Sequence, residues 1–414
     1  MSPGEFSDAM AGFGPAPGVV AVAVSGGPHS LALALLARGW ASRAGIRIVA
    51  LVAEHGLRAE SAAEAADVAA MLAGQGIETR ILPLGLPPGA AMQERARTAR
   101  LAALLGACAQ AGAAWLLLGH HRMDQAETLL LRAGRGRGHS GLAGMPAHRA
   151  TAEALILRPL LGTAPAALEA ICAQAGLAPV RDLSNDNPSF ARIRARKTLA
   201  DPGGAGPRVA ALAAAARGFA RRRMAQEEAL LERLATAVVL FPFGAARLDR
   251  VALGRDAVAA GLLGRLLRAI GGTLHAPSHA DVMRLLEAGH GTLGGAWWRG
   301  DGWLIREPAL LAPPIPAEAG AIWDGRFHLR CSQPGCLIGA LGAQPVAQSA
   351  WPAALRAGLP ALWRDGMMLA APHISVGETL DCLVFRPIGG PVGSVFGGKP
   401  QLGHSPQSNV TYVM

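Results

Sequence analysis

The sequence contains very little lysine. Of its 39 basic residues only Lys197 and Lys399 are lysines, so arginine carries nearly all the positive charge. The formal net charge is +10 and the pI is about 10.7, a balance that favours a polyanionic partner such as RNA or an acidic surface. The planar guanidinium of arginine binds phosphate through two parallel hydrogen bonds, which suits such a partner.

Cysteine is also scarce and scattered. The five cysteines form no paired C-x-x-C motif, and their odd number argues against a disulfide framework and against a zinc cluster. They are Cys108, Cys172, Cys331, Cys336 and Cys382. This usage is typical of a reducing compartment.

Long apolar runs are absent as well. No run reaches the roughly 18 residues that a membrane span needs. Residues 1–17 carry Glu5 and Asp8 and lack a basic region followed by an apolar one, so we expect no secretory signal. With 51% hydrophobic and 16% charged residues, the chain is expected to be a globular protein of the cytoplasm, without membrane association.

The first half of the chain alternates short apolar runs with helical patterns. Residues 19–24, 46–53, 80–84 and 115–119 are predicted as buried strands, and residues 30–43, 61–75 and 90–110 as helices between them. This alternation predicts an α/β fold, a parallel sheet with helices on both faces. Ligands of such sheets bind beyond the carboxyl ends of the strands, where Ser25, Glu54 and His120 follow apolar runs.

Breaker-rich segments divide the remaining sequence. The Gly/Pro-rich residues 201–207 and the four prolines of residues 308–316 are predicted boundaries. Helical patterns cover residues 208–239, 255–270 and 279–288. We therefore expect three domains: an N-terminal domain at 1–202, a helical middle domain at 208–307 and a small α+β domain at 317–414.

A short glycine-containing loop follows the first predicted strand. Ser25-Gly26-Gly27 precedes a helix that starts near Ser30, and this order is typical of phosphate binding. Glycines allow the backbone to approach the phosphate oxygens, and the amides at the helix start act as donors. The motifs G-x-x-x-x-G-K-[ST] and G-x-G-x-x-G are absent, so a plain strand-turn-helix remains an alternative at this point.

The loop, residues 25–30, resembles the S-G-G-x-D-S loop of the PP-loop ATP pyrophosphatases, whose fold is adenine nucleotide α-hydrolase-like. Further segments resemble the tRNA(Ile)-lysidine synthase family within that group, in the same order along the chain. Residues 54–58 (EHGLR) are similar to D-H-G-L-R, and residues 93–100 (QERARTAR) to an arginine-rich helix. Residues 120–128 (HHRMDQAET) are similar to H-H-x-D-D-Q-A-E-T, residues 158–161 to R-P-L-L and residues 182–185 to D-x-S-N.

The resemblance implies a definite reaction. Members of this family use ATP to adenylate C2 of the anticodon wobble cytidine of tRNA(Ile) with a CAU anticodon. The ε-amine of L-lysine then displaces AMP. Mg²⁺ is the metal that the resemblance implies. The sequence does not fix the oligomeric state, and a homodimer is one possible state.

The resemblance also assigns residues by matching positions. The nucleotide is expected to contact Ser25, Gly26, Gly27, Pro28, His29 and Ser30. The candidate catalytic residues are Asp124, Glu127 and His121, and the candidate metal ligands are Glu54 and Asp124. Candidate contacts to phosphate or tRNA are Arg97, Arg100, Arg135, Arg192, Arg194 and Arg196.

Three positions depart from the family pattern. His29 and Met123 stand where members carry an acid, and Glu54 stands where they carry aspartate. A neutral imidazole is a poor ligand for Mg²⁺, which prefers oxygen. Two alternatives are therefore kept: a catalytically impaired tRNA-binding relative, or another PP-loop ATPase such as a tRNA thiolase. Thiolases need paired cysteines near the site, and only Cys108 lies in the first 150 residues.

Overall fold

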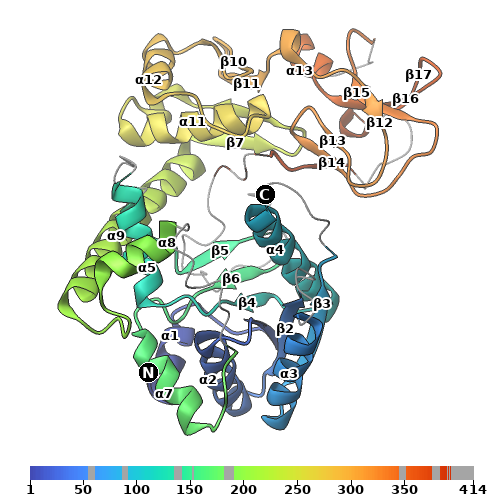
Figure 1. Cartoon of the computed structure of the whole chain (residues 1–414). Helices are drawn as coiled ribbons and strands as arrows, with labels where there is room; N and C mark the ends of the chain where they lie inside the picture. The colour runs from blue at the N-terminus through green and yellow to red at the C-terminus, as the bar shows by residue number, and fades with distance from the viewer. Residues whose placement is uncertain are drawn as a thin grey trace. The chain divides into compact units, whose positions relative to one another are not determined.

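The computed structural model describes residues 1–54, 61–85, 92–134, 142–151, 153–180, 191–344, 351–374, 383–388, 390 and 392 (Figure 1). The chain divides into two compact units, Met1–Arg223 and Met224–Met414, with the division inside helix α9 (Pro207–Ala237). Among the described residues, no helix is both long and apolar enough to cross a membrane. The expected three-domain division remains a prediction.

The N-terminal unit is built on a six-stranded sheet in the order β3-β2-β1-β4-β6-β5 (Figure 1). Its strands are β1 (Val19–Val24), β2 (Arg47–Glu54), β3 (Glu78–Pro83), β4 (Trp115–Leu117), β5 (His148–Ala150) and β6 (Leu155–Leu157). The four predicted strands are present and parallel. The edge strand β5 is antiparallel to β6, so the sheet is mixed, and neither of these three-residue strands was predicted.

Helices cover both faces of this sheet. The predicted helices are observed as α2 (Pro28–Ala44), α3 (Ser61–Gly74) and α4 (Met92–Ala111), and the unit also contains α1 (Pro3–Ala11), α5 (Arg122–Ala133), α7 (Pro165–Gln174) and α8 (Ala191–Leu199). Successive strand residues point to opposite faces. Accordingly Val20 and Val22 pack in a core with α2, whereas Ala21 packs in a second core with α4.

The strand ends position the polar residues. Ser25 follows β1, Glu54 ends β2, and His120 lies three residues beyond β4. Because these strands are parallel, all three residues emerge at the carboxyl edge of the sheet, as the sequence predicted.

A small apolar cluster packs α5 against α8 and α9. Met123 is 1% exposed and contacts Ala126, Leu199 and Val209. A packing role for Met123 explains why a motif that is otherwise polar carries a methionine at this position.

The C-terminal unit combines the predicted helices α11 (Ala257–Gly271) and α12 (His279–Ala288) with three sheets that the sequence analysis did not predict in detail. Two short helices, α10 (Arg250–Leu253) and α13 (Ala353–Ala357), and the turns η2 (Pro308–Leu310) and η3 (Pro372–Ile374) complete it. The five-stranded sheet has the order β7-β8-β11-β10-β9, made of Val238–Phe241, Ala245–Leu248, Trp303–Arg306, Ala296–Trp298 and Gly291–Leu293. Runs of three or four residues are too short to show the alternation of a strand, so the sequence predicts only helices for the middle domain.

The other two sheets are small. One has the order β12-β15-β16-β17, formed by Ile315–Pro316, Leu337–Ala340, Pro360–Arg364 and Met367–Ala370. The other has the order β13-β14-β18, formed by Ile322–Trp323, Phe327–Leu329 and Leu383–Phe385.

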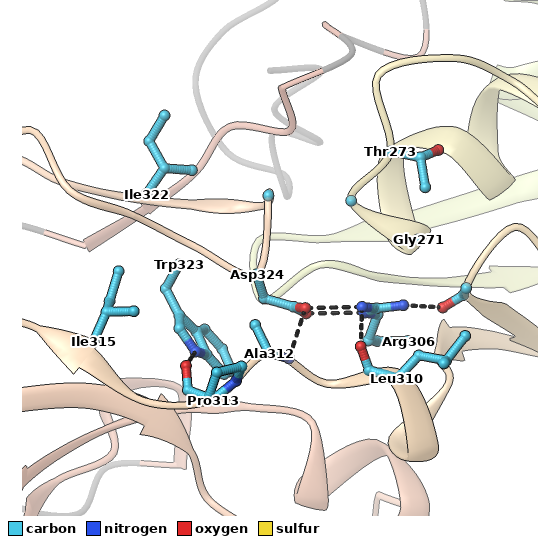
Figure 2. Close-up of a pocket in the computed structure, with 13 residues that line it drawn as sticks. Gly271, Thr273, Arg306, Leu310, Ala312, Pro313, Ile315, Ile322, Trp323 and Asp324 are labelled. Carbon is cyan, nitrogen blue, oxygen red and sulfur yellow. Dashed lines mark hydrogen bonds and ion pairs between the residues drawn. The ribbon is translucent and has the colours of Figure 1, made fainter.

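A buried ion-pair cluster holds the C-terminal unit together beside a cavity of about 590 Å³ (Figure 2). Arg306 donates to both oxygens of Asp324 at 2.9 and 2.8 Å, and Arg326 Nε donates to Asp324 Oδ2 at 2.8 Å. The amide of Ala312 donates to Asp324 Oδ1 at 3.1 Å. Burial acts against ionisation, but these bonds and the two guanidinium charges hold the pKa of Asp324 below its ordinary value. The carboxylate that lines this cavity is thus already saturated by the protein's own donors.

We predict that Met123→Asp destabilises the N-terminal unit by at least about 2 kcal/mol, because it places a carboxylate in an apolar cluster. Urea unfolding followed by circular dichroism measures the loss. Met123→Leu is the control and should cost less than about 1.5 kcal/mol. Equal stability of the Asp and Leu variants would contradict the packing role.

Asp324→Ala is predicted to destabilise the C-terminal unit by about 3–5 kcal/mol, since it leaves two buried guanidinium groups without their carboxylate. The exposed pair of Arg299 and Asp301, 2.9 Å apart, is the matched control. Asp301→Ala should cost about 1 kcal/mol or less. Thermal unfolding of the two variants compares them, and similar melting temperatures would refute the structural role of Asp324.

Candidate active site at the carboxyl edge of the sheet

The loop between β1 and α2 makes a turn that depends on glycine. Gly26 has φ +79°, and a Cβ atom there would lie 2.7 Å from Val68 Cγ2. The carbonyl of Gly26 accepts a hydrogen bond from the amide of Val180 at 3.0 Å. Both the backbone conformation and the space around it therefore require glycine at this position.

Two serine hydroxyls fix the shape of this loop. Ser30 Oγ donates to the carbonyl of Gly27 at 2.9 Å and accepts from the amide of Ser25 at 3.1 Å. Gly27 is the N-cap of α2 and supplies no side-chain cap, and Pro28 occupies the first helical position. The amides of the first turn are thus left to bind an external acceptor, which is the arrangement that binds phosphate at helix starts.

A second glycine brings the end of β4 against this helix start. A Cβ atom on Gly119 would lie 3.2 Å from both the carbonyl oxygen of His29 and the Cα of Ser30. Only a residue without a side chain allows this approach without displacement. The sequence places Gly119 at the end of a predicted strand, and it does not indicate this close packing because a single glycine there has no distinguishing pattern.

The side chain of His29 lies between two other elements. Its ring meets the ring of His121 edge-on, with centroids 4.1 Å apart, and its Nε2 lies 3.6 Å from Glu169 Oε1 on α7. Burial, followed by the nearby His121, lowers the pKa of His29 to about 4. His29 is therefore neutral near pH 7. Glu169 was not predicted, because nothing in the sequence indicates that α7 packs on α2.

His121 and Asp124 form the start of α5. The amide of His121 donates to Asp124 Oδ2 at 2.9 Å, and His121 Nδ1 lies 3.6 Å from the same oxygen. Burial opposes ionisation of Asp124, but His121, His120 and this amide bond hold its pKa below the ordinary value. Burial lowers the pKa of His121, and it lowers that of His120 to about 4. One ionised carboxylate thus lies beside two neutral imidazoles.

Glu127, one turn further along α5, is fully buried. Arg196 Nε donates to Glu127 Oε1 at 2.8 Å, and Oε2 has no hydrogen-bond partner among the described residues. Burial raises the pKa of Glu127, although the charge of Arg196 acts in the opposite direction. One oxygen of this buried carboxyl group is therefore without a donor from the described residues.

Gln125, between these two acids, has a structural role. Its side-chain amide exchanges two hydrogen bonds with the backbone of Met145, at 2.9 and 2.7 Å. These bonds tie the segment that precedes β5 to helix α5.

The described residues do not fit a resident metal centre. Within the described ranges, no three His, Cys, Asp or Glu side chains lie close enough together to hold an ion. Glu54 accepts a hydrogen bond from the hydroxyl of Ser61, and His29 is not an oxygen ligand. Nucleotide-bound Mg²⁺ commonly takes one or two carboxylates together with substrate phosphates. Binding of Mg²⁺ by Glu54 and Asp124 stays a prediction.

The predicted arginines are partly gathered at this edge. The charges of Arg97 and Arg192 act on His120 and Asp124. The pKa of Arg100 is lowered, mainly by burial and then by repulsion from the charge of Arg97. Arg196 binds Glu127, and Arg194 is exposed on α8. Arg135 lies outside the described residues, as do residues 55–58 and 182–185.

The N-terminal half of the chain matches a known domain. The model of the PP-loop domain matches residues 10–202. A tRNA(Ile)-lysidine synthase of Novosphingobium aromaticivorans is 48% identical over 186 residues, 44% of this chain and 56% of that relative. One of Hyphomonas neptunium is 47% identical over 187 residues, 44% of this chain and 50% of that relative. In these two alignments the chain spans about half the length of each relative.

A longer alignment covers most of both chains. A tRNA(Ile)-lysidine synthase of Ruegeria pomeroyi is 34% identical over 378 residues, which are 85% of this chain and 87% of that relative. The similarity thus extends beyond the PP-loop domain into the C-terminal unit. On this extent of similarity, the chain belongs to the tRNA(Ile)-lysidine synthase family.

Proposed function

We propose that this chain is an ATP-dependent ligase that attaches lysine to C2 of the wobble cytidine in the CAU anticodon of tRNA(Ile), with release of AMP and pyrophosphate. One observation carries the proposal. Gly119 holds the phosphate-binding turn of residues 25–30 against the His120, His121 and Asp124 group, so that nucleotide and acceptor groups meet at one sheet edge. A homodimer and a cytoplasmic location belong to the same proposal.

The nucleotide loop would hold the phosphates of ATP, which enters as its Mg²⁺ complex. Gly26 and Gly27 let the backbone approach, and the free amides at the start of α2 donate. Ser25 and Ser30 keep the turn in shape, and Pro28 starts the helix. His29 adjoins the same phosphates as a neutral imidazole that can donate one hydrogen bond.

Asp124 and His121 would handle the lysine amine. The ionised carboxylate of Asp124 attracts the ε-ammonium, and the neutral imidazole of His121 accepts the proton that the amine must lose before attack. Asp124 then stabilises the imidazolium that forms. The free Oε2 of Glu127 offers a second acceptor for the ammonium.

The thiolase alternative finds no support in the cysteines. Cys108 and Cys172 pack in different hydrophobic cores of the N-terminal unit, so they do not form a pair. Burial raises the pKa of Cys108 to about 11, which keeps it a thiol. The named relatives are lysidine synthases, which does not favour the impaired-enzyme alternative.

Incubation of the protein with ATP, radiolabelled lysine and a tRNA(Ile) transcript should give one lysine per tRNA and one AMP per lysine. A transcript with uridine at the wobble position is the control and should give neither product. No incorporation at any Mg²⁺ concentration would contradict the proposal. If His29→Asp then restored incorporation, His29 would be identified as the cause of impairment.

His121→Asn is predicted to lower kcat by roughly 10²- to 10⁴-fold, the usual contribution of a positioned general base. The base is active above its pKa, and burial lowers that pKa, so activity should persist below pH 6.5 and be lost only at lower pH. Asp124→Asn removes a negative charge that raises the pKa of His121. The pH at which activity is lost on the acid side should therefore be lower in this variant than in the wild type.

Rate–pH profiles at saturating substrates test both variants, with the exposed His279→Asn as the matched control. An acid limb that is identical in wild type, Asp124→Asn and His121→Asn would show that His121 is not the proton acceptor.

A further inference from the structure

The edge strand β5 carries an arginine that no motif of the sequence analysis included. Arg149 is exposed and lies opposite Ile156 of β6. Charged residues on an edge strand often serve only to prevent unwanted strand pairing. The neighbouring residues distinguish that role from a binding role.

Arg158 follows β6 at the carboxyl edge of the sheet and is held in place by the backbone. Its amide donates to the carbonyl of Ala147 at 2.8 Å, and its guanidinium donates to the carbonyl of Pro146 at 2.9 Å. Its Nε is buried and has no hydrogen-bond partner among the described residues. A buried donor without a partner is costly, and a ligand acceptor would remove that cost.

Positive charge is concentrated around Arg158. Burial and then the charges of Arg149 and Arg97 lower the pKa of Arg158 to about 10. Arg97 experiences the same repulsion from Arg192 and Arg149. In the described part of the chain neither Arg149 nor Arg158 forms an ion pair, whereas Arg196 is paired with Glu127. Three guanidinium groups, from α4, β5 and the end of β6, thus lie near enough to repel one another, and Asp124 is the carboxylate that acts on Arg97.

We propose that Arg97, Arg149 and Arg158 form a binding site for a phosphodiester group of an RNA strand. The inference rests on the proposed function, because it names how the tRNA is held beside the reacting base. Guanidinium groups bind phosphate oxygens through charge-assisted bonds, and the free Nε of Arg158 is one such donor.

The position in the sheet favours RNA over the nucleotide. Strands β5 and β1 are separated by three strand spacings, about 14 Å, so this site is distinct from the loop that follows β1. It adjoins the reacting group instead, since Arg158 and Arg97 both lower the pKa of His120. An RNA strand with one base at His120 and Asp124 must place its neighbouring phosphates close by.

Arg149→Gln tests the site most cleanly, because the side chain is exposed and the change removes the charge while leaving a polar side chain. Filter binding of the tRNA transcript should show roughly tenfold weaker affinity. A plot of the logarithm of the association constant against the logarithm of the salt concentration should have a slope that is smaller in magnitude by about one. Arg149→Glu should weaken binding further. Arg38→Gln, an exposed arginine ten residues into α2, removes the same charge and should leave both quantities unchanged.

Arg158→Gln should show the same loss of affinity as Arg149→Gln, and its melting temperature reports any damage from losing the Pro146 contact. Unchanged tRNA affinity and salt slope in the Arg149 variants would overturn the proposal. So would weakened ATP binding, measured without RNA, if tRNA binding stayed normal. Absence of ligase activity in the wild type would contradict the proposed function alone, because the binding measurements do not depend on turnover.

Discussion

The close approach of Gly119 to the start of α2 is the contact on which the arrangement of the site depends. A Cβ atom on Gly119 would lie 3.2 Å from the carbonyl oxygen of His29 and from the Cα of Ser30, closer than side chains normally approach backbone. This contact sets the turn of Ser25 to Ser30 directly beside His121. A side chain at 119 would force the start of α2 to shift, although every strand could still form.

Burial at this edge of the sheet then determines which groups carry charge. The imidazoles of His29, His120 and His121 are desolvated and have lowered pKa values, so they are neutral near pH 7. Asp124 stays ionised because the start of α5 donates to it. The arginines cannot lose their charge in the same way, and Arg149 and Arg158 form no ion pair with any described carboxylate. The result is a set of neutral imidazoles beside the ionised carboxylate of Asp124. The arginines around Arg158 add positive charge next to this set, and the phosphates of an RNA strand could neutralise it.

Much of the N-terminal unit could be predicted from the sequence because its strands and helices are long enough to show a period. The runs at 19–24 and 46–53 are continuous and apolar, and each is followed by a polar residue that marks the carboxyl edge. The strands β5 and β6 and all described strands of the C-terminal unit are only two to five residues long. Their existence depends on partners far along the chain, which a local pattern does not contain.

The sequence by itself determined the parallel α/β core, the glycine-containing turn after the first strand, the polar residues at the strand ends and the resemblance to one family. These properties follow from local periodicity and from motifs whose residues are close together in the chain. Only the tertiary structure decided that Glu169 faces His29, that Glu127 binds Arg196 and that Met123 is a packing residue, and only it places Arg149 and Arg97 near enough to Arg158 for their charges to lower its pKa. Each of these contacts joins elements separated in sequence, and burial, which depends on the whole fold, sets the charge of the groups involved.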